Sequence, residues 1–418
     1  MTMEILRSFQ PISISLSPNT EKDDILLSLK MIFQPWQWKN GKEIEELEKK
    51  FKDYLKANFA ISFNSGRSAL LAILKSLNLK ENEEVLIQAF TCNAAVNPIL
   101  WAGLNPVFVD CNEKTFNMDI DILEKSITAR SRVVMVQHTF GLPANIKRVL
   151  DICQKNNLIL IEDCAHSLGA DFQNRKLGTF GRAAFFSLSR DKVISSVYGG
   201  MAITNDEILA KNIKEFQKKI EFPSYLWIFQ QLLHPVLMNY LILPTYSVMR
   251  FGKTLLNAFQ WLQILSKAVH WKEKRGGKPG YFPKRLPNAL ANLTLNQFGK
   301  LERFNQHRRE IADFYYNKLK DTDFTLPISE GQIFLRFAIK HPKAHQIIKK
   351  AWKKNILIGD WYTTAIAPHD TKLEKMQYKP GSCPNAEKLC KETLNLPTHI
   401  NISRKEAEKI VDFLKNIK

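Results

Sequence analysis

The chain has 418 residues, a formal net charge of +19, 45% hydrophobic residues and 24% charged residues. The length predicts two or three domains, and the composition is typical of a globular protein with a large core. Lysine and arginine are spread along the chain without an RNA or DNA motif, which argues against a nucleic-acid partner. Most of the charge is therefore interpreted as a solvated lysine-rich surface, and attraction of an anionic substrate or lipid is the alternative.

Between residues 60 and 205, short apolar runs alternate with amphipathic segments. The runs are rich in Val, Ile and Phe without strict polar alternation, as expected for strands buried on both faces. They cover Phe59–Phe63, Glu84–Ile87, Pro106–Asp110, Arg132–Val136, Leu158–Glu162, Ala183–Leu188 and Met201–Thr204. The amphipathic segments are Ser68–Leu77, Ala94–Trp101, Asp119–Ala129 and Ile146–Asn156. This alternation predicts an α/β domain whose central, mainly parallel sheet is flanked by helices.

Residues 207–279 are predicted to form a helical insertion. The part from Phe222 to Met249 contains no Asp, Glu, Lys or Arg, although two prolines interrupt it. Three interpretations stay open: helices packed on the protein, a helix pair lying on a membrane surface through residues 222–270, and a transmembrane span.

The C-terminal part predicts a second, smaller α/β domain. Its expected elements are a long helix over Asn296–Leu319, a strand over Ile333–Ile339, a helix over Ala344–Lys353, a strand over Ile356–Trp361 and a helix over Arg404–Asn416. We therefore expect a large domain over residues 1–280 and a small domain over residues 281–418.

The cysteines and the N-terminal residues indicate the cellular compartment in which the protein is expected. The six cysteines form no C-x-x-C pair, and residues 1–16 show no charged segment followed by an apolar one. We expect no metal site, a reducing compartment and a cytoplasmic location, peripheral at the inner face of the membrane if the insertion lies on a bilayer.

Three stretches carry the candidate chemistry. The first, "FNSGRSALLAILKSL", places Ser65, Gly66 and Ser68 where a strand ends and a helix begins. Free backbone N–H groups and the helix dipole at such a point bind a phosphate well. A Ser-Gly turn that only caps a helix has the same pattern.

The second stretch, "LILIEDCAHSLGA", is an apolar strand that ends in a carboxylate, Asp163. Ligands of open α/β sheets lie outside the carboxyl ends of the strands, and a buried carboxylate there needs a partner such as a protonated pyridine nitrogen. Ala165 is small enough to lie against a flat ring, and His166 is placed to bond a ring oxygen. A helix N-cap for Asp163 and a loop or core histidine are the alternatives.

The third stretch, "FFSLSRDKVISSVYGG", places Ser187 at a strand end and Lys192 in the loop that follows. A desolvated amine loses its proton more easily and becomes a nucleophile toward an aldehyde. A solvated loop lysine is the alternative for Lys192.

Together, "SGRSAL", "EDCAHSLG", "FSLSRDKVI", "YGG" and "TND" resemble, in this order, the DegT-type sugar aminotransferases. These belong to the aspartate-aminotransferase-like superfamily, which has fold type I and uses pyridoxal 5'-phosphate (PLP). The resemblance implies that Lys192 forms the Schiff base, that Asp163 holds the pyridine nitrogen and that His166 contacts the ring hydroxyl. It also implies that Ser187 and the backbone of Gly66–Ser68 hold the phosphate.

The sequence departs from the family pattern at three places. Cys92 stands where an aromatic residue usually stacks on the PLP ring, and Phe90 is the nearby candidate to replace it. Arg67 replaces a threonine, which either adds charge to the phosphate site or faces solvent. "GYFPKR" keeps Arg285, a substrate or cross-dimer candidate, but lacks the asparagine that often crosses to the partner's phosphate.

The reaction implied by the resemblance is transfer of an amino group from an amino acid, with glutamate expected, to a nucleotide-linked keto-sugar in polysaccharide biosynthesis. Related dehydratases carry histidine at the position of Lys192, so this lysine favours transamination. The resemblance also implies a homodimer with sites at the interface. A non-catalytic member that binds an anionic partner and a different PLP-dependent reaction are the two alternatives.

Overall fold

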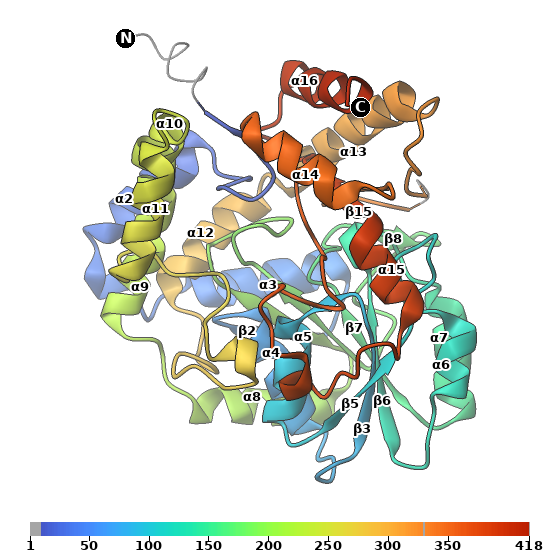
Figure 1. Ribbon diagram of the computed structural model, residues 1–418. Coiled ribbons are helices and arrows are strands. Elements are labelled where there is room, and N and C mark those ends of the chain that lie inside the picture. The colour runs from blue at the N-terminus through green and yellow to red at the C-terminus, as the bar shows by residue number, and fades with distance from the viewer. Residues whose placement is uncertain (1–9, 329–330, 418) are drawn as a thin grey trace.

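The computed structural model describes residues 10–328 and 331–417. Its centre is a seven-stranded sheet in the order β2-β11-β10-β7-β6-β3-β5 (Figure 1). The strands are β2 (Phe59–Phe63), β3 (Glu84–Gln88), β5 (Asn105–Val109), β6 (Ser131–Gln137), β7 (Ile159–Asp163), β10 (Ala183–Ser187) and β11 (Gly200–Thr204). Only β11 runs antiparallel to its neighbours, so the predicted α/β fold with a mainly parallel sheet is confirmed.

Helices cover both faces of this sheet because successive side chains of a strand point to opposite sides. Phe185 packs in a core with the helices over residues 66–76, 93–101 and 207–219. Its neighbour Phe186 packs in a core with the helices over residues 43–55 and 288–298. The helices are α2 (Lys22–Ile32), α3 (Glu43–Leu55), α4 (Gly66–Ser76), α5 (Asn93–Trp101), α6 (Ile120–Lys125), α7 (Ile146–Lys155) and α8 (Glu207–Lys219). Helices α2 and α3 were not predicted from the sequence.

The C-terminal part corrects three predictions. The expected helix over Asn296–Leu319 is two helices, α12 (Asn288–Phe298) and α13 (Leu301–Leu319), which are separated at Gly299, a poor helix former. The expected strand over Ile333–Ile339 is only β12 (Phe337–Lys340), because Phe334 has a φ of 51° and interrupts the extended backbone. The predicted strand over Ile356–Trp361 is likewise shorter, since β13 covers only Ile356–Leu357.

The remaining C-terminal elements are α14 (Ala344–Lys353), β14 (Ile366–Ala367), α15 (Pro384–Glu392), β15 (Thr393–Leu396) and α16 (Arg404–Lys415). Most of the apolar side chains between residues 311 and 414 share one core, whereas α12 packs against α3 in the N-terminal half. Short strands also join distant parts: β1 (Ile12–Ser13) pairs with β13, and β4 (Thr91–Cys92) pairs with β14. The division at residue 280 stays a prediction.

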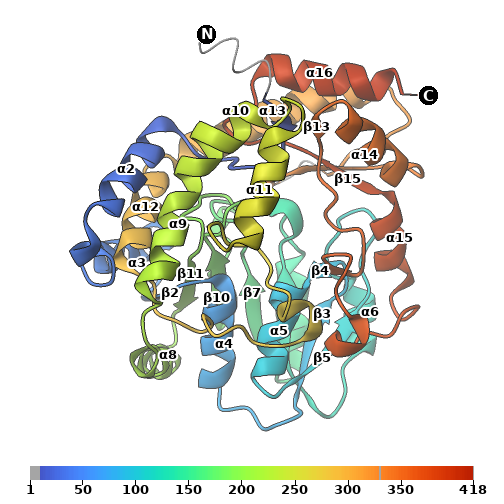
Figure 2. The same cartoon turned by 60° about the vertical axis from the view of Figure 1, so that its left-hand side comes forward.

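The predicted insertion over residues 207–279 begins with α8, which packs on the central sheet, and is largely helical as far as residue 261. It contains α9 (Tyr225–Leu237), a π-helical turn (Met238–Ile242), α10 (Leu243–Thr245) and α11 (Phe251–Trp261). Figure 2 shows α9 lying beside α2 and α12, and the Ser28 hydroxyl donates a hydrogen bond to the Leu232 carbonyl at 2.5 Å. Within the described residues, one helical stretch, Tyr225–Thr245, is long and apolar enough to cross a membrane, and 39% of it is buried in the protein.

Candidate active site

A cavity of about 240 Å³ lies beyond the carboxyl ends of β7 and β10. Its lining includes most of the residues that the sequence predicted: Ser65, Gly66, Arg67, Cys92, Asp163, Ala165, His166, Ser187 and Lys192. These residues come from four separate stretches of chain, which the parallel order of the strands brings to one edge of the sheet. Ser68 and Arg285 do not line this cavity.

Lys192 lies in the loop after β10, and its backbone is held from two sides. Asn19 donates to the Lys192 carbonyl at 2.5 Å, and the buried Arg308 donates to the Val193 carbonyl at 2.7 Å. Burial lowers the pKa of the Lys192 ammonium group, while the nearby carboxylates of Asp191 and Asp163 oppose this effect. The amine is therefore neutral more often than a solvated lysine, as a nucleophile or proton acceptor requires.

Asp163 ends β7 and is 5% exposed. Its Oδ1 accepts a hydrogen bond from the Ala165 N–H at 3.0 Å, which fixes the carboxyl group. Burial raises the pKa of Asp163, and that hydrogen bond and the Lys192 ammonium lower it. A buried carboxylate with so few partners is best stabilised by a bound cation.

His166 lies parallel to Trp361, with ring centroids 5.5 Å apart. Burial, followed by the charges of Lys192 and Arg336, lowers the pKa of His166 well below its usual value, so the ring is neutral. Its Nδ1 accepts a hydrogen bond from the Phe140 N–H at 3.3 Å. The ring hydrogen is consequently on Nε2, which can donate to an oxygen in the cavity.

The start of α4 forms a narrow backbone cradle. The Ser65 side chain caps the helix by accepting from the Ser68 N–H at 3.1 Å. A Cβ atom on Gly66 would lie 3.1 Å from the Ser187 Cβ and 3.4 Å from its hydroxyl oxygen, so glycine keeps this space open. Ser68 points elsewhere, because its hydroxyl bonds Asn64 at 2.7 Å.

Arg67 does not face solvent, and its expected contribution to the phosphate site stays a prediction. Its guanidinium forms an ion pair with the fully buried Glu273 at 2.6 Å and donates to the Ala268 carbonyl at 2.9 Å. Both partners belong to the last part of the insertion. Arg67 therefore joins α4 to the insertion at the wall of the cavity, while Glu273 neutralises its charge.

Phe90 does not replace the missing aromatic residue at Cys92. It is fully buried and packs against Phe116, Phe140 and Tyr362 outside the cavity lining. Aromatic rings reach the cavity instead from residues 360–369, because the pairing of β4 with β14 brings that segment across Cys92. Trp361 lies there, with its ring centroid 4.9 Å from the Lys192 Nζ.

Arg285 lies away from this cavity. Its guanidinium is 4.3 Å from the Phe222 ring centroid, and it lines a different cavity together with Glu48 and Lys214. The single chain leaves its cross-dimer role a prediction.

Several lining residues were missed in the sequence. Arg190 and Asp191 directly precede Lys192, and their charged side chains beside a loop lysine were a usable signal. Trp361 and Tyr362 follow Lys192 by more than a hundred residues and carry no local motif, so only the fold reveals them.

Glu162 precedes Asp163 and organises the wall behind the site. Its carboxylate accepts backbone hydrogen bonds from Gly178 at 2.8 Å, Phe180 at 2.7 Å and Gly181 at 2.8 Å, and it is fully buried.

We expect Glu162→Gln to lower the free energy of unfolding by about 2 kcal/mol, because an amide cannot accept from all three donors. Denaturant unfolding checks this value. The exposed Glu124→Gln is the matched control, and an equal loss in both variants would contradict the role of Glu162.

The comparisons with known proteins agree with this arrangement. Residues 19–220 and 256–415 match the DegT/DnrJ/EryC1/StrS aminotransferase family. The unmatched residues 221–255 contain α9, α10 and the start of α11, so the match leaves out the most apolar part of the insertion.

Two curated relatives and one solved structure illustrate the similarity. GDP-perosamine synthase of Escherichia coli O157:H7 is 32% identical over 67% of this chain and 64% of its own length, so this chain spans just under two thirds of that relative. A transaminase of Aneurinibacillus thermoaerophilus, named dTDP-3-amino-3,6-dideoxy-alpha-D-galactopyranose transaminase, is 26% identical over 89% of each chain. NtdA of Bacillus subtilis, solved with its bound cofactor PMP, has a TM-score of 0.72 and 22% identity over 94% of this chain and 81% of its own, which shows a shared fold.

Proposed function

The chain belongs to the DegT/DnrJ/EryC1/StrS aminotransferase family, and from this premise we propose that it is a PLP-dependent aminotransferase that aminates a nucleotide-linked keto-sugar. The observation that carries the proposal is the meeting of Lys192, Asp163 and His166 in one cavity at the edge of the sheet. An amine, a carboxylate and a neutral imidazole at such an edge are the groups that a phosphorylated pyridine aldehyde requires.

The residues present fit PLP. The cradle at Gly66, with the hydroxyls of Ser65 and Ser187, would hold the phosphate, because helix N-terminal N–H groups bind anions. Asp163 would pair with the pyridine nitrogen, Ala165 would lie against the ring, and Lys192 would attach covalently through Nζ. When bound, PLP supplies the electron sink that makes the α-hydrogen of an attached amino acid acidic.

His166 and Trp361 would lie next to the pyridine ring of PLP. The Nε2–H of His166 would donate to the ring hydroxyl oxygen, since its Nδ1 is already used by Phe140. Trp361 would supply an apolar wall beside the ring rather than a free stacking face, because the Arg336 guanidinium lies 3.2 Å from its ring centroid.

The proton transfers are proposed to belong to Lys192. As a free amine, Lys192 would accept the proton from the α-carbon of the amino-acid substrate and would hold it for return within the cavity. Burial supports this role because it lowers the pKa of Lys192 toward the working pH. Asp163, with its negative charge retained, would stabilise the positive pyridine nitrogen throughout.

The test uses a panel of nucleotide-linked keto-sugars and ¹⁵N-labelled glutamate. We expect an amino sugar that carries the label, together with 2-oxoglutarate. Label that appears only in free ammonia, or a dehydrated sugar without label, would contradict amino-group transfer. The donor and the identity of the sugar stay predictions until then.

The pH dependence offers a separate prediction at Asp191. Its carboxylate raises the pKa of Lys192 and also pairs with Arg336 at 3.2 Å. Asp191→Asn removes the carboxylate charge and leaves the guanidinium of Arg336 without this partner. We therefore expect the pKa of Lys192 to fall further, and the acid limb of the rate profile to shift to lower pH. A pH titration of the amino-transfer rate measures this. An acid limb that stays in place or moves upward would contradict it.

A homodimer with sites at the interface is the proposed assembly. The family resemblance supports it, and Arg285 lies in the segment expected to cross between subunits. Light scattering of the PLP-loaded protein is expected to give twice the mass of one chain. A fully active monomer would contradict the assembly.

A further inference from the structure

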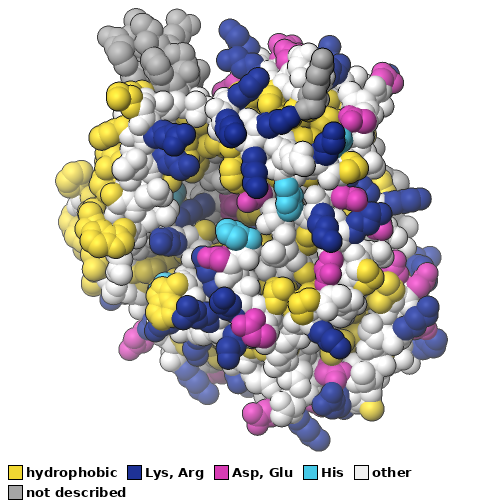
Figure 3. Space-filling model, viewed as in Figure 1, with side chains coloured by type: hydrophobic (Ala, Val, Ile, Leu, Met, Phe, Trp, Pro, Cys, Tyr) yellow, Lys and Arg dark blue, Asp and Glu magenta, His cyan; other side chains and the backbone are white. Residues whose placement is uncertain are grey.

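An exposed apolar face runs over α2, the following 3-10 turn (Pro35–Gln37) and the insertion helices. We call it the apolar face, and its exposed side chains are Leu26, Phe33, Trp36, Tyr225, Leu226, Tyr240, Val248, Met249, Phe251, Trp261 and Leu262. Met249 is 96% exposed and Trp261 is 80% exposed. In Figure 3 hydrophobic side chains gather along the edge where Figure 1 places α2 and α9–α11.

Helix α11 is only partly covered by the protein: Leu256 and Phe259 pack against a small core, whereas Phe251 and Trp261 stay exposed. Its sequence, "FGKTLLNAFQW", is largely apolar, yet Gly252 is its one buried residue. Helix α9 differs, since Trp227, Ile228 and Leu232 bury one side of it against the protein. A contiguous patch of exposed aromatic and aliphatic side chains of this kind marks a contact with another apolar phase.

The charges within the insertion part of the face are of one sign, whereas α2 carries Asp23 and Asp24 in its first turn. Residues 222–272 contain no aspartate or glutamate, whereas Arg250, Lys253, Lys267 and Lys272 lie among them. Two copies that met through this face would bring these cations together. An anionic leaflet instead attracts each of them while the aromatic side chains enter the interface.

The face is joined to the candidate active site. The segment after α11 lines the cavity with Ala268 and Val269. Tyr198 donates its hydroxyl hydrogen to the Lys267 carbonyl at 2.7 Å, and the Ser266 hydroxyl donates to Gln231 of α9 at 2.6 Å. The insertion therefore forms part of the cavity wall.

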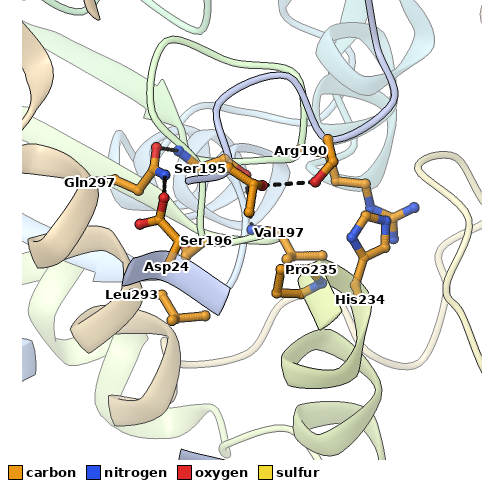
Figure 4. Close-up of a pocket in the computed structure, with 11 residues that line it drawn as sticks. Asp24, Arg190, Ser195, Ser196, Val197, His234, Pro235, Leu293 and Gln297 are labelled. Carbon is orange, nitrogen blue, oxygen red and sulfur yellow. Dashed lines mark hydrogen bonds between the residues drawn. The ribbon is translucent and has the colours of Figure 1, made fainter. Parts of the chain in front are cut away.

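A second contact lies deeper. Figure 4 shows His234 and Pro235 of α9 facing the loop Ser195–Val197, which follows Lys192, across a small cavity of about 20 Å³. Gln297 of α12 donates to Asp24 of α2 at 2.7 Å beside it. The cavity is too small for a substrate, so its lining serves to fix the insertion against the loop that carries Lys192.

We propose that the apolar face docks the protein on an anionic lipid bilayer, with the insertion helices lying in the interface and the chain remaining on one side. The buried part of Tyr225–Thr245 supports this orientation, because Trp227, Ile228 and Leu232 cannot face lipid while they pack on the protein. Docking would hold the wall of the active-site cavity close to the membrane surface. This inference goes beyond the proposed amino transfer and does not depend on it.

The test is co-sedimentation of the full, PLP-supplemented chain with vesicles of phosphatidylcholine alone or mixed with phosphatidylglycerol. We expect binding to the anionic vesicles at low salt and a strong reduction at high salt. Met249→Glu combined with Trp261→Glu is expected to weaken vesicle binding by at least about tenfold. Lys253→Gln is expected to weaken it by about fivefold at low salt.

The matched control places two glutamates on exposed apolar positions outside the face, Ile208 and Ile328. This control should bind vesicles like the unaltered chain, and all variants should keep their amino-transfer rate in solution. An unaltered chain that stays in the supernatant with anionic vesicles would overturn the proposal, as would equal binding of the Met249→Glu/Trp261→Glu variant. The proposal would also be overturned if light scattering gave the Met249→Glu/Trp261→Glu variant half the mass of the unaltered protein. The face would then join two copies of the chain.

Discussion

Lys192→Ala is expected to lower the rate of amino-group transfer by at least about 10³-fold, since it removes both the covalent attachment to PLP and the group that moves the proton. The fold should be unaffected, because the loop is held through the backbone carbonyls of Lys192 and Val193 by Asn19 and Arg308. Rapid mixing of the PLP-supplemented variant with an amino-acid donor measures the loss.

A matched control replaces a lysine on the surface, Lys155, whose side chain is 71% exposed. Lys155→Ala should transfer amino groups at the rate of the unaltered chain. Borohydride reduction followed by peptide mapping should find the cofactor on the Lys192 peptide in the control and nowhere in Lys192→Ala. Near-normal turnover of Lys192→Ala would exclude Lys192 as the reactive amine.

Asp163→Asn should lower the rate by about 10²-fold while PLP binding changes far less. The asparagine keeps the shape and its oxygen still accepts from the Ala165 N–H, but the negative charge that holds a proton on the pyridine nitrogen is lost. A titration with PLP gives the affinity, and single-turnover kinetics with an amino-acid donor give the rate.

The loss at Asp163 should be specific to its place in the cavity. Asp121→Asn, at an exposed carboxyl group that is 73% accessible, serves as the control and should change neither quantity. If Asp163→Asn reacted with the donor as fast as the unaltered chain, the carboxylate would have no electronic role. If it lost PLP affinity and rate in equal measure, its role would be binding alone.

The sheet could be predicted because buried strands and amphipathic helices leave a strong periodic signal. The strand Phe59–Phe63 was predicted at its observed bounds, and the others within one or two residues. The central residues of the site were also predictable, since Asp163, Ser187 and Lys192 follow strand ends at a sheet edge. At those positions the residue type suits the chemistry, and the strand order places the residue at the edge of the sheet where ligands bind.

Other features depend on contacts that sequence periodicity does not contain. Arg67 stands at the motif position where related sequences have threonine. The position of its guanidinium is set by the ion pair with Glu273, which lies about two hundred residues later in the chain. Trp361 enters the cavity because β14 pairs with β4, and both strands are only two residues long. The apparent strand at Ile356–Trp361 ends early for the same reason, since the chain leaves β13 to cross the site.

The most direct test of the account is the donor half of the reaction, because it requires no knowledge of the sugar. The PLP-loaded protein is mixed with ¹⁵N-labelled amino acids, and the mass of the released cofactor is measured by mass spectrometry. We predict pyridoxamine phosphate that carries ¹⁵N, formed by the unaltered chain and absent with Lys192→Ala. Cofactor that remains PLP with every donor, or that gains nitrogen equally with Lys192→Ala, would contradict the proposed aminotransferase.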